Sequence, residues 1–137
     1  MEIRFQGRRP VRQHEDDAGA DLTAAETVKI PAGGIASVGT GTRVQLPTGT
    51  VGVVASRSGL AFTHGVGLVN GIGVIDAGFT GEIRVALVNN SRTPFTVRAG
   101  DRVAQLVVMP VWLPTFIEGG FDQTVRGDAG FGSTGAA

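Results

Sequence analysis

Glycine and proline interrupt this chain so often that no long helix can form. The 137 residues include 22 Gly and 6 Pro, and the longest run without either spans the 12 residues from Glu82 to Thr93. Both residue types destabilise the interior of a helix. The short segments that remain between them therefore have to be strands or turns.

Several of these segments alternate apolar and polar residues, with a period of two that is typical of half-buried strands. The segments are TVKI, TRVQL and EIRVALV, and the residues on their apolar faces are Val28 and Ile30, Val44 and Leu46, and Ile83, Val85 and Leu87. Many short strands between glycine-containing turns predict an all-β sandwich or barrel. The run from Val103 to Val111 is apolar at nearly every position, which predicts a strand covered on both faces, in the centre of a sheet or at a subunit interface.

The composition argues against several classes of protein. Basic and acidic residues balance at 12 each, whereas a protein that coats nucleic acid needs positive charge to neutralise phosphates. The absence of Cys excludes disulfides and thiolate metal sites, and the N-terminal segment has no apolar stretch suited to a signal peptide. No segment approaches the ~20 apolar residues of a membrane span. We therefore expect one cytoplasmic domain with neither a membrane nor a nucleic acid partner.

Two segments combine Arg, hydroxyl and Gly residues. One is SRSG at residues 56–59, and the other is the tail RGDAGFGSTG at residues 126–135. Guanidinium groups, hydroxyls and backbone amides left accessible by Gly are the groups that bind phosphate. Neither segment is a P-loop, because the sole Lys is Lys29. Taken alone, each segment is a weak indication of phosphate binding, and a turn that carries a surface Arg is the more common case.

Two carboxylates, Asp21 and Asp76, also lie in Gly-containing segments. By spacing alone, Asp76 fits a hairpin turn and Asp21 fits the start of a strand. His14 and His64 have no partner at ligand spacing, so a zinc site is not expected. Ser58 has no His and Asp partners in a recognisable order, which argues against a triad hydrolase.

Taken in order, five segments resemble the motifs of the trimeric dUTPase family. They are AGADLTA (18–24), SRSGLA (56–61), VNGIGVIDAGFTGEI (69–83), GDRVAQLVV (100–108) and RGDAGFGSTG (126–135). The resemblance implies a jelly-roll-like β-barrel over residues 1–125. It also implies a flexible, Gly-rich C-terminal arm, residues 126–137, which closes over the active site of a neighbouring subunit in a homotrimer with shared sites.

The family resemblance further implies Mg²⁺-dependent hydrolysis of dUTP to dUMP and pyrophosphate. This reaction limits uracil incorporation into DNA and supplies dUMP for thymidylate synthesis. Asp76 would be the general base that activates a water for in-line attack on the α-phosphorus, and Asp21 would contact Mg²⁺ through water. The substrate-binding residues would be Arg57, Ser58, Gly59 and Gln105 at the phosphates, Asn70, Gly73, Val74, Ile75 and Phe79 at the uracil and deoxyribose, and Arg126, Phe131, Gly132, Ser133 and Thr134 in the arm, with Phe131 stacking on the base.

Three positions depart from the family pattern. Ser56 stands where Pro is usual, Ala129 where Gly is usual, and Phe79 where Tyr is usual. Phe79 keeps the ring face that packs on deoxyribose, so we expect discrimination against a 2′-hydroxyl to survive. Two alternatives are a dCTP deaminase, which shares this fold, and a non-catalytic β-barrel module that keeps the nucleotide pocket. The full set of carboxylates and phosphate-binding residues favours the hydrolase.

Overall fold

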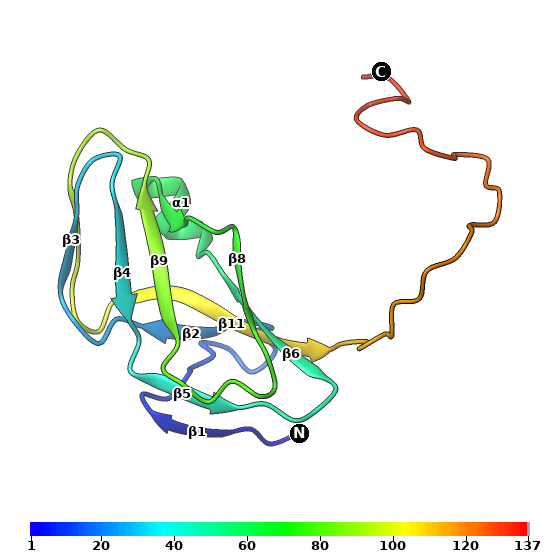
Figure 1. Ribbon diagram of the computed structural model, residues 1–137. Helices are drawn as coiled ribbons and strands as arrows, with labels where there is room; N and C mark the ends of the chain where they lie inside the picture. The colour runs from blue at the N-terminus through cyan, green and yellow to red at the C-terminus, as the bar shows by residue number, and fades with distance from the viewer. Residues whose placement is uncertain (137) are drawn as a thin grey trace.

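The computed structural model describes residues 1–136, and the body of the protein is built almost entirely from short antiparallel strands (Figure 1). Within these residues there is a single short helix, α1 (Ser58–His64). The strands are β1 (Arg4–Gly7), β2 (Ala20–Thr23), β3 (Val28–Ile30), β4 (Ile35–Gly39), β5 (Thr42–Gln45), β6 (Thr50–Ala55), β7 (Val66–Leu68), β8 (Ile72–Ile75), β9 (Arg84–Asn89), β10 (Phe95–Val97) and β11 (Arg102–Pro110). The all-β prediction is confirmed.

The strands pair into four sheets, and the largest of them positions the candidate site. Its strand order is β2–β11–β6–β8, so β2 and β8 are its two edges. A three-stranded sheet runs β4–β9–β7, and two-stranded sheets join β1 to β5 and β3 to β10. The apolar run from Val103 onward lies in β11, between β2 and β6, which confirms the prediction of a central strand.

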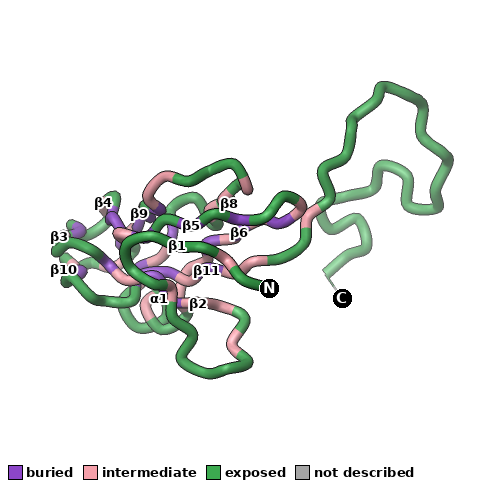
Figure 2. The backbone as a smooth tube through the Cα atoms, turned by 90° about the horizontal axis from the view of Figure 1, so that it is seen from below, coloured by how far each residue is buried: buried purple, intermediate pink, exposed green. Residues whose placement is uncertain are grey.

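The apolar faces that the sequence predicts form the core. Along the segment that leads into β9, Ile83, Val85 and Leu87 are at most 2% exposed, while Arg84 between them is exposed. The same inward direction is found for Ile30, Val44 and Leu46. Burying one such side chain contributes roughly 1.5–3 kcal/mol. Figure 2 shows that the buried residues lie within the body of strands and that the C-terminal segment has none.

Helix α1 differs from the turn expected at residues 56–59. Ser58 and Gly59 begin the helix, which buries none of its residues and therefore leaves no apolar period in the sequence. It ends at Gly65, whose left-handed φ of 68° lets its N–H bond back to Ala61. Of the residues described, none forms a helix long and apolar enough to cross a bilayer.

The chain separates from the body after β11 (Figure 1). From Val111 to the end of the described residues there is neither strand nor helix. Apolar side chains on this stretch are almost fully exposed, including Trp112 at 93% and Phe116 at 92%. The segment includes the expected arm from Arg126 but begins earlier in the chain; Ala137, the last residue of that arm, lies outside the described residues.

Candidate active site

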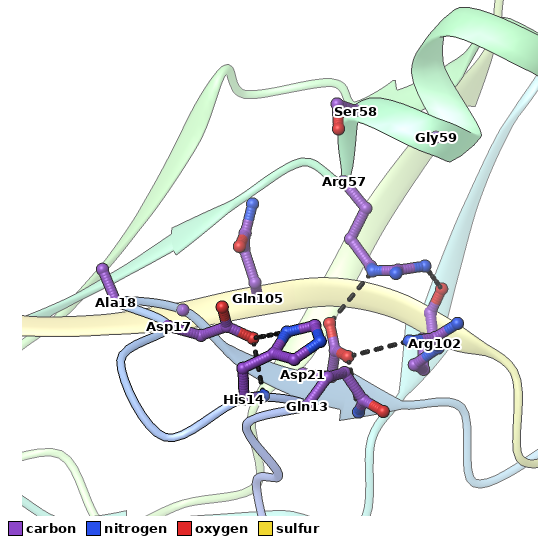
Figure 3. Close-up of a pocket in the computed structure, with 11 residues that line it drawn as sticks. Gln13, His14, Asp17, Ala18, Asp21, Arg57, Ser58, Gly59, Arg102 and Gln105 are labelled. Atoms are coloured by element: carbon purple, nitrogen blue, oxygen red, sulfur yellow. Dashed lines mark hydrogen bonds and ion pairs between the residues drawn. The ribbon is translucent and has the colours of Figure 1, made fainter.

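A pocket of about 490 Å³ opens at the edge of the four-stranded sheet, between the loop that precedes β2 and the start of α1 (Figure 3). It brings together the residues outside the arm that are expected at the phosphates, and the expected metal contact. The lining residues predicted from the sequence are Asp21, Arg57, Ser58, Gly59 and Gln105. The other lining residues are Gln13, His14, Asp17, Ala18, Gly19 and Arg102.

Asp21 is the carboxylate at the centre of this pocket, and it is only 8% exposed. Its Oδ1 accepts a hydrogen bond from Nε of Arg57 at 3.0 Å. Its Oδ2 accepts from Nε2 of Gln13 at 3.0 Å and from Nη1 of Arg102 at 3.4 Å. Burying a charge is costly unless it is paired and hydrogen-bonded, and these three donors meet that requirement.

Gln105 lies next to Asp21 because the two residues are directly paired across β11 and β2. Paired residues of neighbouring strands place their side chains on the same face of the sheet. Gln105 donates from Nε2 to the carbonyl oxygen of Ser56 at 3.0 Å. A Cβ at Gly19 would overlap Oε1 of Gln105, so the Gly of the AGAD segment makes room for this amide.

Arg57, Ser58 and Gly59 form the wall opposite the loop. The Nη1 of Arg57 donates to the carbonyl oxygen of Arg102 at 3.4 Å, which adds a second contact to the Asp21 ion pair. Ser58 and Gly59 are the first residues of α1, where backbone N–H groups lack intrahelical acceptors. A fixed guanidinium, a hydroxyl and accessible amides in one wall are suited to phosphate oxygens.

A second carboxylate, Asp17, lies on the rim. The backbone N–H of His14 donates to Oδ2 of Asp17 at 2.9 Å, and this bond is the main cause that lowers the pKa of the Asp17 carboxyl below its ordinary value. Nδ1 of His14 lies 3.1 Å from the same oxygen. Asp17 is therefore ionised at neutral pH and adds negative charge to the rim.

The described residues contain no group of three His, Cys, Asp or Glu side chains that could hold a metal by themselves. This arrangement does not fit a metal held in a cage of protein ligands. It fits Mg²⁺, which usually keeps several waters and shares the phosphates of a substrate. Asp21 is the carboxylate placed beside the phosphate-binding wall.

Asp76 lies outside this pocket, exposed at the end of β8. Asp21, Gln105, Ala55 and Ile72 form one row across the sheet, one residue from each strand. Three strand spacings, about 14 Å, therefore separate Asp21 from β8, and Asp76 is further along that strand. A general base has to come within hydrogen-bond reach of the group it deprotonates, so Asp76 cannot serve the pocket of its own chain.

The residues expected to contact uracil and deoxyribose lie between Asn70 and Phe79, on β8 and the turns at its two ends. We call this segment the hairpin, as the sequence predicts, although β7 and β8 pair with different strands. β8 is an edge strand, so the N–H and C=O groups on its outer side have no partner strand within the described chain. At the turn, the N–H of Ile72 bonds to the carbonyl of Asn70 at 2.8 Å. Phe79 is 43% exposed, and its ring lies so close to Gly81 that a Cβ there would be 2.8 Å from Cζ.

The arm residues are separate from both groups. Arg126 bonds to the carbonyl of Ala129 at 2.8 Å within the arm itself, and Phe131 is fully exposed. Gly132, Ser133 and Thr134 are exposed as well. One chain thus presents three separate groups of predicted site residues: the phosphate pocket, the hairpin and the arm.

Sequence reasoning missed four polar residues of the pocket: Gln13, His14, Asp17 and Arg102. Arg102 lies inside the quoted segment GDRVAQLVV, where a charged residue directly before a central apolar strand was a usable signal. The other three belong to an irregular loop, and no local pattern marks such residues as neighbours of Asp21.

Comparison with known proteins identifies the family. A family model described as dUTPase matches residues 6–135. The chain belongs to the dUTPase family. Among curated proteins, the deoxyuridine 5'-triphosphate nucleotidohydrolase of Leifsonia xyli subsp. xyli is 48% identical over 130 residues, which cover 93% of this chain and 86% of the relative. The protein of the same name from Nocardia farcinica is 49% identical over 128 residues, or 92% of this chain and 78% of the relative.

Solved dUTPases share the fold over nearly the whole chain. A mutant dUTPase of Staphylococcus bacteriophage 80alpha with dUpNHpp superposes with a TM-score of 0.90 at 27% identity, covering 98% of this chain and 99% of that one. A mutant dUTPase from phage phi11 of S. aureus, described as revealing the coordination of a structural Mg(II) ion, has a TM-score of 0.83 at 26% identity and covers 90% and 100%. The present chain therefore has the jelly-roll-like β fold of the dUTPases, as the family resemblance implies.

Proposed function

We propose that this dUTPase-family chain hydrolyses dUTP to dUMP and pyrophosphate with Mg²⁺, in a homotrimer whose active sites combine segments from different subunits. Membership of the family supports the activity. The observation that carries the sharing of sites is the separation, within one chain, of Asp76 from the pocket that holds Asp21 and Arg57. A complete set of groups forms only when the hairpin of one chain meets the pocket of another.

The exposed apolar surface supports an oligomer. Val74 of the hairpin is 60% exposed, and Trp112, Phe116 and Ile117 after β11 are 87–93% exposed. Large apolar side chains that are this exposed in a single chain favour burial against a partner surface. A neighbouring copy of the chain that covers these residues would at the same time bring its own pocket or arm to the hairpin.

At the phosphates, Arg57 is the main cation. The hydrogen bond from its Nε to Asp21 holds the side chain in one orientation. The remaining N–H groups of the guanidinium can then bind phosphate oxygens without first losing conformational freedom. The Ser58 hydroxyl, the Gly59 amide and the Gln105 side-chain amide add donors. Donors fixed before the reaction stabilise the charge that spreads over phosphoryl oxygens in the transition state. Asp21 would hold Mg²⁺ through one of the waters of the ion, which would supply charge neutralisation at the phosphate oxygens.

Asp76 is the general base. Its carboxylate accepts a proton from a water as the water oxygen bonds to the α-phosphorus. The bond from that phosphorus to the bridging oxygen breaks on the opposite side, and pyrophosphate leaves. Exposure of Asp76 at the end of an edge strand leaves its carboxylate accessible to the pocket of a neighbouring chain.

The hairpin would bind the base and the sugar and select between substrates. The free backbone edge of β8, from Gly73 to Ile75, and the amide of Asn70 can match the O4 and N3–H of uracil, whose donor and acceptor pattern is the reverse of cytosine. The backbone of this segment, placed close to the base, would leave no room for the methyl group of thymine. The exposed ring of Phe79 packs on deoxyribose and excludes a 2′-hydroxyl.

The arm completes the site from a third direction. Phe131 would stack on uracil, and base–aromatic stacking contributes roughly 1–3 kcal/mol. Arg126, Ser133 and Thr134 would contact phosphates, and the missing side chain of Gly132 lets the backbone approach them. Full exposure of these residues in the single chain leaves them free to do so on a neighbour.

Pyrophosphate release tests this proposal. Purified protein with Mg²⁺ should release pyrophosphate from dUTP and much less from dCTP, dTTP or UTP, and EDTA should stop the reaction. Comparable turnover of dTTP or UTP would contradict the proposed selection of uracil and deoxyribose by the hairpin. Ammonia release from dCTP would indicate the deaminase, and dUTP binding without turnover would indicate the non-catalytic module. Light scattering should give the mass of three chains.

A further inference from the structure

Strand β11 contains a bulge directly beside the pocket. Arg102 and Ala104 pair with adjacent residues of β2, so Val103 is an extra residue without a partner on that strand. Val103 and Ala104 are both buried, at 1% and 0% exposure. Successive side chains of a regular strand point to opposite faces. A regular β11 would therefore place Val103 on the face of Gln105 and turn Arg102 into the core; the bulge brings Arg102 onto the Gln105 face instead.

The redirected Arg102 closes a ring of contacts with Asp21 and Arg57 (Figure 3). Its Nη1 lies 3.4 Å from Oδ2 of Asp21. Its carbonyl oxygen accepts a hydrogen bond from Nη1 of Arg57 at 3.4 Å, and Nε of Arg57 lies 3.0 Å from Oδ1 of Asp21. Arg102 thus contacts the anion through its side chain and the second cation through its backbone.

The charges of the pocket show what this contact does. Asp17 and Asp21 are balanced by Arg57 and Arg102, so loss of Arg102 would leave one negative charge in excess where a polyanion has to bind. Arg57 alone would also have to neutralise Asp21 and the substrate phosphates together. Asp21 has a side chain only 11% exposed, and a buried charge without sufficient partners is costly.

We propose that Arg102 is a positioning residue for the hydrolysis: placed by the bulge at Val103, it holds Asp21 and thereby keeps Arg57 oriented and available for the phosphates. This inference rests on the proposed roles of Arg57 at the phosphates and Asp21 beside them. Arg102 acts on substrate binding through Asp21, so its effect depends on the charge of that carboxylate.

The test is a set of variants measured with dUpNHpp as the ligand and dUTP as the substrate. Arg102→Met keeps an unbranched stem and removes the charge; it should weaken dUpNHpp binding about tenfold, equivalent to about 1.4 kcal/mol, and should raise KM while kcat changes little. Arg102→Lys restores a point charge and should recover most of the affinity. Arg43→Met removes the same charge from an exposed residue of β5 that makes no ion pair among the described residues, and should bind like the wild type. If Arg102→Met does not fold, Arg102→Gln takes its place.

A double-mutant cycle with Asp21→Asn decides whether Arg102 acts through Asp21. Residues that act through one another are non-additive, so Arg102→Met should have little further effect on dUpNHpp affinity in the Asp21→Asn background. Equal losses in both backgrounds, or a lower melting temperature with unchanged affinity, would overturn the inference. Those results would contradict the role of Arg102 but not dUTP hydrolysis by the wild type. A wild type without dUTP turnover would instead contradict the proposed function, and the binding measurements would still test the role of Arg102.

Discussion

Gly19→Ala should lower activity while leaving stability nearly unchanged. The Cβ of an alanine at this position would overlap the side-chain amide oxygen of Gln105, and it would lie 3.1 Å from Cδ of the same side chain. The amide end of Gln105 can rotate away, whereas its Cβ, 3.3 Å from the added Cβ, has to shift by a few tenths of an ångström. Rotation breaks the 3.0 Å hydrogen bond from Gln105 to the carbonyl of Ser56 and takes the amide out of the phosphate pocket.

The two contributions to stability nearly cancel. Loss of the Gln105 hydrogen bond costs about 0.5–1.5 kcal/mol. Gly19 is not among the residues with positive φ, so Gly→Ala also restricts the unfolded chain and returns about 0.4–1 kcal/mol. The expected effect on activity is larger, because a hydrogen bond to a charged phosphate contributes about 1.5–3 kcal/mol, which corresponds to a decrease of roughly ten- to a hundredfold in kcat/KM.

Urea unfolding and dUTP turnover measure the two effects separately, and Gln105→Ala provides the comparison. If Gly19→Ala acts by displacing Gln105, the double variant should be no less active than Gln105→Ala alone. Full activity of Gly19→Ala, together with impaired Gln105→Ala, would refute the displacement. An equal loss from Gly19→Ala in the presence and absence of the Gln105 side chain would refute it as well.

Three further predictions follow from the three groups of site residues. Asp76→Asn should lose about 10²–10⁴-fold in kcat yet bind dUpNHpp normally in a titration; near wild-type kcat would mean that another group is the base. Arg57→Ala should weaken dUpNHpp binding at least tenfold, since a charge-assisted contact contributes roughly 1.5–3 kcal/mol, and unchanged affinity would remove Arg57 from the phosphate site. Deleting residues 126–137 should leave the number of chains per oligomer and the melting temperature unchanged, because the described residues of this arm bury nothing, while dUTP turnover is lost; a truncated protein that failed to assemble would make the arm structural.

The strands could be predicted because their signal is local. Val85 and Leu87 point inward and Arg84 points outward whatever the partner strand is, so a period of two in the sequence is sufficient. Helix α1 has no such signal, because it is short and none of its residues is buried. A helix can be predicted from sequence when it is long enough for its helix propensities to add up and when a buried face gives it an apolar period. Helix α1 has only seven residues and no buried face.

The family resemblance identified candidate residues of the pocket, but it did not show how the fold brings them together. Asp21 and Gln105 meet because β2 pairs with β11 in a particular register, and Arg102 joins them only because Val103 is bulged. Register and strand order are set by long-range pairing rather than by local sequence. The same strand order places Asp76 at the opposite edge of the sheet, which the segment around Asp76 does not reveal.

Subunit complementation tests most directly the claim that the base and the arm of one site come from different chains. Asp76→Asn chains with intact arms and chains that keep Asp76 but lack residues 126–137 should each be nearly inactive alone. When both are co-expressed in equal amounts, a site has one chance in two of an intact base and one in two of an intact arm, so about one quarter of the sites in randomly assembled trimers should be active. Recovery of about a quarter of wild-type dUTP turnover in the whole co-expressed population is the predicted result; a population as inactive as its two parents would contradict the account.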